Sequence, residues 1–154
     1  MAPLSAGTQR LSDRIVGAWT LLSWSRFLGD VEEPGLLGRD AVGQLLYSPE
    51  GYMSAHLMRR VRTRFATDDV AGSPDPLERA AAYDGYQGYC GRYEVDEAGS
   101  FVVHRVTLSS NPNWTQSMQK RFVEFVGGRM KLTTPPILGR GKQATVVLIW
   151  ERAS

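Results

Sequence analysis

The stretch that decides the fold runs from residue 119 to residue 134 and reads QKRFVEFVGGRMKLTT. Two runs of β-forming residues flank Gly127-Gly128, which is typical of a hairpin with a two-residue turn. Pairing across this turn fixes which side chains share a face of the hairpin. The apolar face carries Val123, Phe125, Met130 and Leu132. The opposite face carries Lys120, Glu124, Arg129 and Lys131, and we expect it to face solvent.

Arg121 is the exception on this hairpin, because it is in line with the apolar face, at the end far from the turn and opposite Thr134. An arginine that points inward is costly unless it is paired or meets a polar ligand. Two interpretations stay open. Arg121 is either a structural residue that caps the barrel floor or a residue that binds a ligand.

Other segments repeat the hairpin pattern. Ser48-Pro49-Glu50-Gly51 and Glu97-Ala98-Gly99 each separate two β-forming runs. Asp75, Pro76 and Glu78 are typical of a helix start, and the helix is expected to end near Gly88. The strands are expected at residues 15–27, 43–47, 52–58, 92–96, 101–108, 119–126, 129–134 and 144–152. The pattern predicts an all-β fold, an antiparallel barrel of about eight strands with one short α-helix, wide enough to hold one small ligand.

The bulk composition limits the possible partners. The chain has 154 residues, 42% of them hydrophobic and 22% charged, with a net charge of +2. We expect a flexible tail over residues 1–13 and a single domain over residues 14–154. The basic residues do not form a stripe that could follow the phosphate backbone of a nucleic acid, so we expect no nucleic-acid partner. No run of apolar residues approaches the roughly 20 that are needed to span a bilayer. Four arginines at residues 59–64 are interpreted as a solvated strand end, with an anion site as the alternative.

The single cysteine bears on the compartment. Cys90 excludes a disulfide within the chain, and we interpret it as a small buried hydrophobic residue. Residues 1–14 contain no apolar run typical of a secretory signal. A cytoplasmic protein is therefore expected.

Alternation assigns the two histidines to different faces. Across the Ser48 turn, the residues on the inner face are Leu45, Tyr47, Met53, Ala55 and Leu57. His56 is in the opposite phase and is expected to face outward. His104 alternates with Arg105, which sends His104 inward, where it is either a hydrogen-bonded core residue or a proton-transfer group.

Aromatic residues are candidates for the mouth of the cup. Tyr83, Tyr86 and Tyr89 recur every three residues along the expected helix. We assign Tyr83 to packing, and Tyr86 and Tyr89 to the mouth. Trp114 lies in a loop, Asn111-Pro112-Asn113-Trp114, and either covers the mouth as a lid or fastens the loop to the core.

Several kinds of chemistry have no motif here. The sequence contains neither a glycine-rich phosphate loop nor a Gly-x-Ser-x-Gly elbow. Two histidines facing opposite ways predict no histidine-based metal site. We therefore expect no cofactor and no metal. Any catalysis would depend on proton transfer, electrostatics and the shape of the cavity.

The order of motifs from Ile15 onward is more specific than any one of them. They are Gly17-Ala18-Trp19, Leu22-Ser23-Trp24, residues 47–55, residues 91–95, Val103-His104, Pro112-Asn113-Trp114 and residues 129–136. Together they resemble the lipocalin-like domain family of bacteria and fungi. The resemblance implies a calycin-type barrel in which Trp19 plugs the closed end. It also implies that an arginine covers this tryptophan, either Arg152 on the last strand or Arg121.

The resemblance also implies a place in secondary metabolism, where related barrels cyclise or isomerise polyketide- or terpenoid-like intermediates. Our first hypothesis is therefore a cofactor-independent cyclase or isomerase acting on a small apolar intermediate. His104 would be the acid or base, Arg121 would stabilise a developing negative charge, and Tyr93 would join Tyr47 as a hydrogen-bond donor. The expected ligand-binding residues are Tyr47, Met53, Leu57, Tyr86, Tyr89, Trp114, Val123, Phe125 and Met130.

The second hypothesis is a carrier or sequestering protein for the same kind of small hydrophobic molecule. The same cup would serve it, with His104 and Arg121 only orienting the ligand. Either protein would be a monomer or a homodimer.

Overall fold

Eight antiparallel strands close into a barrel in the computed structural model, which describes residues 8–68, 74–139 and 141–154. The strands of the barrel are β1 (Gly17–Leu28), β3 (Val42–Tyr47), β4 (Tyr52–Met58), β5 (Tyr86–Asp96), β6 (Phe101–Ser109), β7 (Met118–Val126), β8 (Arg129–Thr133) and β10 (Lys142–Arg152). Each pairs with the next in this order, and β10 pairs with β1 to close the sheet. The predicted eight-stranded antiparallel barrel is therefore confirmed.

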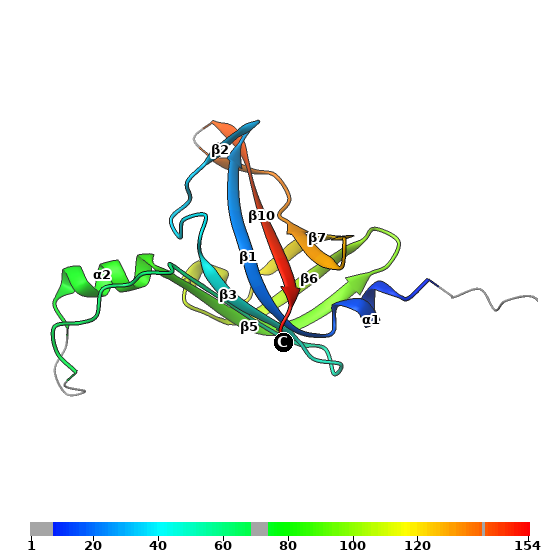
Figure 1. Ribbon diagram of the computed structural model, residues 1–154, viewed down its shortest axis with the longest axis horizontal. Coiled ribbons are helices and arrows are strands. Elements are labelled where there is room, and N and C mark those ends of the chain that lie inside the picture. Colours follow the sequence, from blue (N-terminus) through cyan, green and yellow to red (C-terminus); the bar gives the residue numbers. More distant parts are fainter. Residues whose placement is uncertain (1–7, 69–73, 140) are drawn as a thin grey trace, which may run out of the picture.

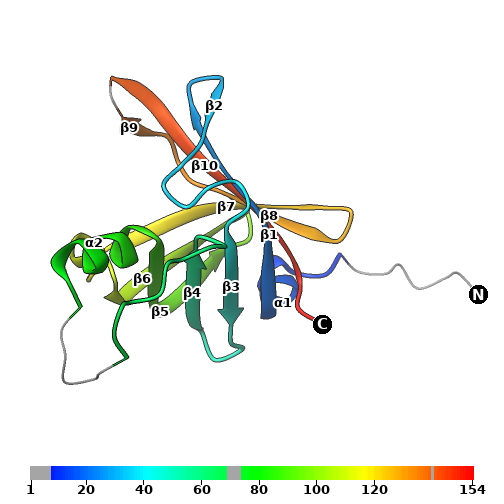
Figure 2. The same cartoon turned by 60° about the vertical axis from the view of Figure 1, so that its left-hand side comes forward.

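Two short strands were not predicted. β2 (Val31–Glu33) pairs with β1, and β9 (Ile137–Gly139) pairs with β10. Figures 1 and 2 show that both lie where β1 and β10 rise as a long ribbon beyond the rest of the barrel. They extend the wall on one side of the open end.

The hairpins follow the predicted register. In the β7–β8 turn, Gly127 and Gly128 have φ of 57° and 80°, values that favour glycine. Phe125 pairs with Met130, and Val123 with Leu132, as expected. In the turn between β5 and β6, the left-handed residue is Ser100 (φ 52°), whereas the sequence pattern had suggested a glycine turn.

The predicted helix is shorter than expected. α2 (Pro76–Asp84) begins with the expected capping box, in which Asp75 accepts from the Leu77 N–H and Glu78 folds back. It ends at Gly85 rather than near Gly88, and β5 begins at Tyr86. Tyr86 and Tyr89 therefore lie on a strand, where they point to opposite faces. The placement of these two tyrosines on a helix was wrong.

Residues 11–13, which were expected to belong to a flexible tail, are helical. α1 (Leu11–Ile15) covers the closed end of the barrel, and Ile15 is fully buried. The Glu97 carboxylate accepts from the Leu11 and Ser12 N–H groups at 2.8 and 3.0 Å. These bonds satisfy two free donors of the first helical turn and so stabilise α1.

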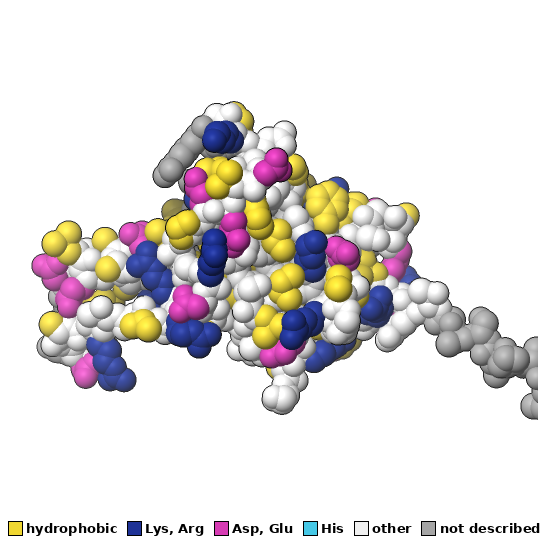
Figure 3. Space-filling view, turned by 45° about the horizontal axis from the view of Figure 1, so that its top comes forward, with side chains coloured by type: hydrophobic (Ala, Val, Ile, Leu, Met, Phe, Trp, Pro, Cys, Tyr) yellow, Lys and Arg dark blue, Asp and Glu magenta, His cyan; other side chains and the backbone are white. Residues whose placement is uncertain are grey.

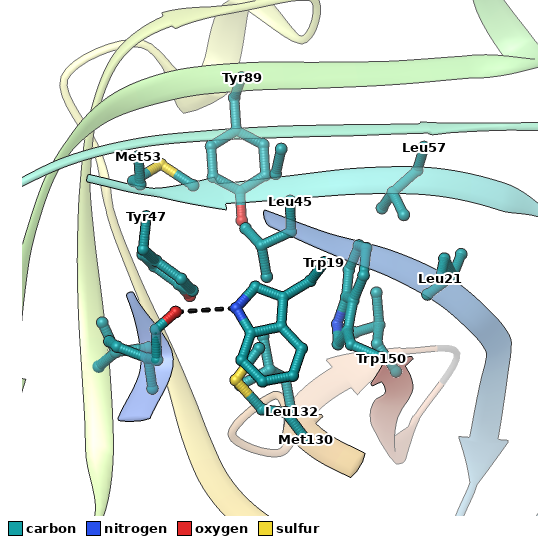
Figure 4. Packing of buried hydrophobic residues seen from close by; sticks show 14 of the residues in the cluster. Trp19, Leu21, Leu45, Tyr47, Met53, Leu57, Tyr89, Met130, Leu132 and Trp150 are labelled. Atoms are coloured by element: carbon teal, nitrogen blue, oxygen red, sulfur yellow. Dashed lines mark hydrogen bonds between the residues drawn. The ribbon is translucent and has the colours of Figure 1, made fainter. Parts of the chain in front are cut away.

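Trp19 plugs the closed end, as the family resemblance implied. Its indole N–H donates to the Ile15 carbonyl at 2.8 Å, the bond drawn as a dashed line in Figure 4. The Arg152 guanidinium lies 4.1 Å from the Trp19 ring centroid and donates to the Val16 and Arg14 carbonyls. Gly17 has φ +126°, and a Cβ there would lie 2.5 Å from Arg152 Nη1, so only glycine leaves room for this cover.

The outer surface is mixed in charge. On the face drawn in Figure 3, lysine, arginine and acidic side chains are interspersed and do not gather into one basic patch. Within the described residues, no helix is long and apolar enough to cross a membrane.

Candidate ligand-binding site

A cavity of about 350 Å³ occupies the open half of the barrel. This volume is at the lower end of the range typical of small-molecule sites. Its walls are mostly apolar and aromatic, with a few polar groups. The described residues that line it are Trp24, Leu45, Ala55, Leu57, Gln87, Tyr89, His104, Trp114, Met118, Gln119, Lys120, Arg121, Leu132, Thr134, Pro135, Ile137, Val146, Leu148 and Trp150.

His104 is the most buried polar residue of this wall, with 1% of its surface exposed. It lies on β6 between Val102 and Val106, which also point inward, so the predicted alternation is confirmed. The Tyr47 hydroxyl lies 2.7 Å from Nε2, and the Tyr89 hydroxyl lies 2.9 Å from Nδ1. Three strands thus supply one hydrogen-bonded chain, Tyr47–His104–Tyr89.

The surroundings of the two tyrosines favour one direction for this chain. A neutral imidazole donates from one nitrogen and accepts at the other. Tyr47 is 2% exposed and has no other hydrogen-bond partner among the described residues, so its proton must go to His104 or stay unpaired in the core. With Tyr47 donating to Nε2, Nδ1–H donates to Tyr89. The Tyr89 hydroxyl proton is then free to point into the cavity.

Arg121 lies beside this chain and is 8% exposed. Its Nη1 donates to the Lys120 carbonyl at 2.8 Å. No carboxylate of the described residues lies within ion-pair distance of it, and none of the described residues that line the cavity is acidic. Since Arg152 covers Trp19, Arg121 does not cap the floor. It places an unpaired positive charge on the cavity wall.

Burial and charge set the protonation states here. Burial, and secondly the Arg121 charge, hold the pKa of His104 well below its ordinary value, so His104 is neutral. Burial raises the pKa of Tyr89, while the charge and hydrogen bonding of Arg121 oppose part of that rise. Burial also raises the pKa of Tyr47 well above its ordinary value. The three hydrogen-bonded side chains, Tyr47, His104 and Tyr89, are therefore uncharged near neutral pH. The positive charge beside them belongs to Arg121.

The lowered pKa of His104 predicts a loss of stability in mild acid. Below pH of about 6.5 the unfolded chain takes up a proton that the native protein refuses. The free energy of unfolding should then fall by up to about 1.4 kcal/mol per pH unit from this group as pH drops from its unfolded pKa towards its folded pKa. Urea unfolding between pH 7.5 and 5.0 measures this slope.

Two glutamine variants provide the comparison. His104→Gln should flatten the slope, whereas His56→Gln, which changes an exposed histidine on the outer face, should keep it. Equal slopes in the wild type and His104→Gln would contradict the assignment.

The structure brings part of the predicted site together. The predicted residues that line the cavity are Leu57, Tyr89, His104, Trp114 and Arg121. Trp114 ends the short 3₁₀ helix η1 (Pro112–Trp114) and packs edge-on against Tyr89, with ring centroids 5.4 Å apart. It therefore both lines the cavity and fastens its loop to the barrel.

Five predicted ligand-binding residues point inward but do not line the cavity. They are Tyr47, Met53, Val123 and Met130, which belong to the packed core, and Phe125, which is partly buried and packs against it. Phe125, for example, lies 6.2 Å from Trp19 between ring centroids and under the Arg14 guanidinium. Their placement in the site was wrong because they lie too close to the closed end.

Two further predicted residues have other roles. Tyr86 lies on the outer face, where its hydroxyl is hydrogen-bonded to His56, so its place at the mouth is corrected. Tyr93 points inward and packs against Tyr47, but its hydroxyl donates to the Ser48 carbonyl at 2.7 Å. It therefore holds a turn and does not reach the cavity.

Cys90 is on the outer face and partly exposed, which corrects its interpretation as a buried residue.

Other lining residues were missed by the sequence analysis. They include Trp24 on β1, then Thr134, Pro135 and Ile137 after β8, and Val146, Leu148 and Trp150 on β10. Leu148 and Trp150 pair with Leu132 and Met130 across β8, so the inward phase of β10 could have been read from the β7–β8 hairpin. Among the described residues, Trp150 Nε1 is the one buried polar side-chain atom without a hydrogen-bond partner.

Comparison with known proteins places the chain in a family. Residues 16–153 match the model of the lipocalin-like domain, and the chain belongs to that family. It is also similar to the 4'-hydroxy-3'-methoxypropiophenone carrier protein ppsC of Aspergillus oryzae. The two are 31% identical over 107 residues, which cover 65% of this chain and 96% of the relative. The barrel, the family and this relative agree on a protein that binds a small molecule.

Proposed function

We propose that this protein binds and carries one small aromatic molecule that bears a polar oxygen, an aryl ketone or a related polyketide-like compound. The observation that carries the proposal is the cavity itself. Three tryptophans, Trp24, Trp114 and Trp150, contribute to its walls, and Tyr89 and Arg121 supply donors on its side. A mostly apolar pocket with a few placed polar groups is the usual design of a small-molecule site.

The similar protein of Aspergillus oryzae supports the ligand class. Its name describes it as a carrier of 4'-hydroxy-3'-methoxypropiophenone, an aromatic ketone with a phenol group. A ligand of this kind presents a flat ring to the tryptophans and an oxygen to Tyr89 or Arg121.

The hydrogen bonds of His104 favour carriage over proton-transfer catalysis. Both ring nitrogens already have tyrosine partners, at 2.7 and 2.9 Å, so no nitrogen is free to accept a substrate proton. One observation favours the alternative, a cofactor-independent cyclase or isomerase. The Arg121 charge could stabilise an enolate. Recovery of the ligand unchanged after long incubation would separate the carrier from the enzyme.

A cavity-filling substitution tests the proposal. Ala55 lines the cavity from β4, so Ala55→Phe should occupy ligand space and weaken binding of 4'-hydroxy-3'-methoxypropiophenone at least tenfold. Quenching of tryptophan fluorescence measures this binding in wild type and variant. Overpacking itself costs about 1–3 kcal/mol, so circular dichroism must first show that the variant is folded.

The matched control is the neighbouring residue on the same strand. Ser54 points to the outer face, where it is hydrogen-bonded to His56, so Ser54→Phe should leave the affinity nearly unchanged. Equal affinities of the two folded variants would show that the ligand does not bind in this cavity.

We also propose that the protein acts in the cytoplasm, where its free Cys90 would stay reduced.

A further inference from the structure

On the wall beside His104, Tyr89 and Arg121 offer hydrogen-bond donors to the cavity, while the amide groups of Gln87 and Gln119 lie elsewhere among its lining residues. With Tyr89 accepting from Nδ1 of His104, the direction favoured above, its own hydroxyl proton is free to donate to a group in the cavity. Arg121 has five N–H donors and no acceptor, and its contacts with the Lys120 carbonyl and with Tyr89 leave further N–H groups free to meet a ligand. A ligand group that meets both residues must therefore accept hydrogen bonds.

The charge of Arg121 indicates what kind of acceptor group the ligand carries. An arginine guanidinium carries a positive charge in proteins. Arg121 is 8% exposed, and its guanidinium has no carboxylate partner among the described residues. A buried cation without a counter-charge is costly, and removing that cost strengthens the binding of an anion. A neutral carbonyl would supply a hydrogen bond but would leave the charge uncompensated.

Resting on the proposed function, we propose that the cavity binds a weakly acidic aromatic ligand in its ionised form, with the anionic oxygen held by Arg121 and the Tyr89 hydroxyl. A phenol conjugated with a carbonyl group fits this description, because its phenolate is stabilised through the ring. The Trp114 ring, edge-on to Tyr89, lies next to the place that such a ring would occupy.

None of the other titratable side chains that the structure describes around the proposed anion site supplies a second positive charge for the ligand. His104 faces it from β6 and is neutral, and Tyr47 lies behind His104 on β3. Lys120 on β7 lines the cavity but its ammonium group lies 3.8 Å from the Phe101 ring centroid and 4.8 Å from that of Phe122. These two aromatic rings engage its charge, so Lys120 does not duplicate Arg121.

The pH dependence of binding separates an anion site from a neutral site. A protein that binds the phenolate gains affinity as the pH rises towards the pKa of the free ligand and keeps it above that pH. A protein that binds the neutral phenol loses affinity tenfold per pH unit above the same pKa. The probe is 4'-hydroxy-3'-methoxypropiophenone. The absorption of its phenolate lies at a longer wavelength than that of the phenol, so the ionisation of the bound ligand can be read directly.

Three ligands and two variants complete the test. The pKa of the bound phenol should lie at least one unit below that of the free phenol, as is usual beside an opposite charge. 3',4'-Dimethoxypropiophenone, which cannot ionise, should bind wild type more weakly by about 10- to 100-fold. Arg121→Met should abolish the pKa shift and equalise the two ketones, while Arg121→Lys should retain part of the shift. 3,4-Dimethoxybenzoate tests whether a carboxylate serves as well as a phenolate.

Each outcome has a definite meaning. Tight binding of both ketones by the wild type without a shift in the phenol pKa would overturn the anion site and leave the carrier function standing. Binding of the benzoate, lost in Arg121→Met, would support an anion site and widen its class to carboxylates. Failure of the wild type to bind any of the three compounds would overturn both proposals. An unchanged pKa shift in folded Arg121→Met would also overturn the role of Arg121.

Discussion

Replacing Trp19 by alanine is expected to lower the free energy of unfolding by about 3–5 kcal/mol, the cost typical of removing a large aromatic side chain from a core. Trp19 is 1% exposed, donates to the Ile15 carbonyl and lies under Arg152. Because the side chains at this end are tightly packed, they should not be able to move into the cavity that the substitution leaves. Urea unfolding followed by circular dichroism measures the loss.

Trp24 is the matched control on the same strand. It is half-buried and lines the open cavity, so Trp24→Ala removes an aromatic side chain from a wall that already borders empty space. We expect a loss of less than half that of Trp19→Ala. A similar loss for the two variants would contradict the assignment of Trp19 as the plug of the closed end.

Local sequence patterns were sufficient to predict the barrel. Turn chemistry at Gly127-Gly128 and at Ser48–Gly51 fixed two registers, and each register determined the faces of two strands. His104 was assigned inward from the same alternation, and the structure confirms it. These features depend on interactions between neighbours in the sequence, and for this reason they can be read without knowledge of the whole fold.

The residues after the helix show where a local pattern misleads. The spacing of three between Tyr83, Tyr86 and Tyr89 is typical of a helix. However, α2 ends at Gly85, and β5 begins at the next residue. The pairing of β5 with β4 and β6 along its whole length outweighs the helical spacing. Tertiary pairing of this kind overrides short-range periodicity.

The sequence pattern also did not predict how deep each inward-facing residue lies along the barrel axis. Alternation says that Phe125 and Leu57 both point inward, but not that Phe125 lies at the closed end and Leu57 at the cavity. Depth depends on the stagger between strands that are distant in sequence, above all on β1 and β10, which carry Trp19 and Trp150. The plug at one end decides which inward residues pack together and which line an open space.

Replacing His104 by leucine is expected to lower the free energy of unfolding by about 2–4 kcal/mol, although leucine is the more hydrophobic residue. The substitution leaves the Tyr47 hydroxyl without a partner in the core, which costs about 1–3 kcal/mol. The Tyr89 hydroxyl loses a bond as well, but it borders the cavity and Arg121, where water can replace the lost partner. The size of the loss therefore depends mainly on Tyr47, and urea unfolding at pH 7.5 measures it.

Double variants identify which tyrosine is responsible. Removing both partners of a buried hydrogen bond costs far less than removing one, so Tyr47→Phe should restore at least about 1 kcal/mol to the His104→Leu protein. Tyr89→Phe in the same background should restore less, because its hydroxyl is not isolated. Equal restoration by the two changes would show that both hydroxyls depend on His104 alike, and that the Tyr47–His104–Tyr89 chain has no preferred direction. Greater restoration by Tyr47→Phe would instead support a chain that begins in the core and delivers its free proton to the ligand.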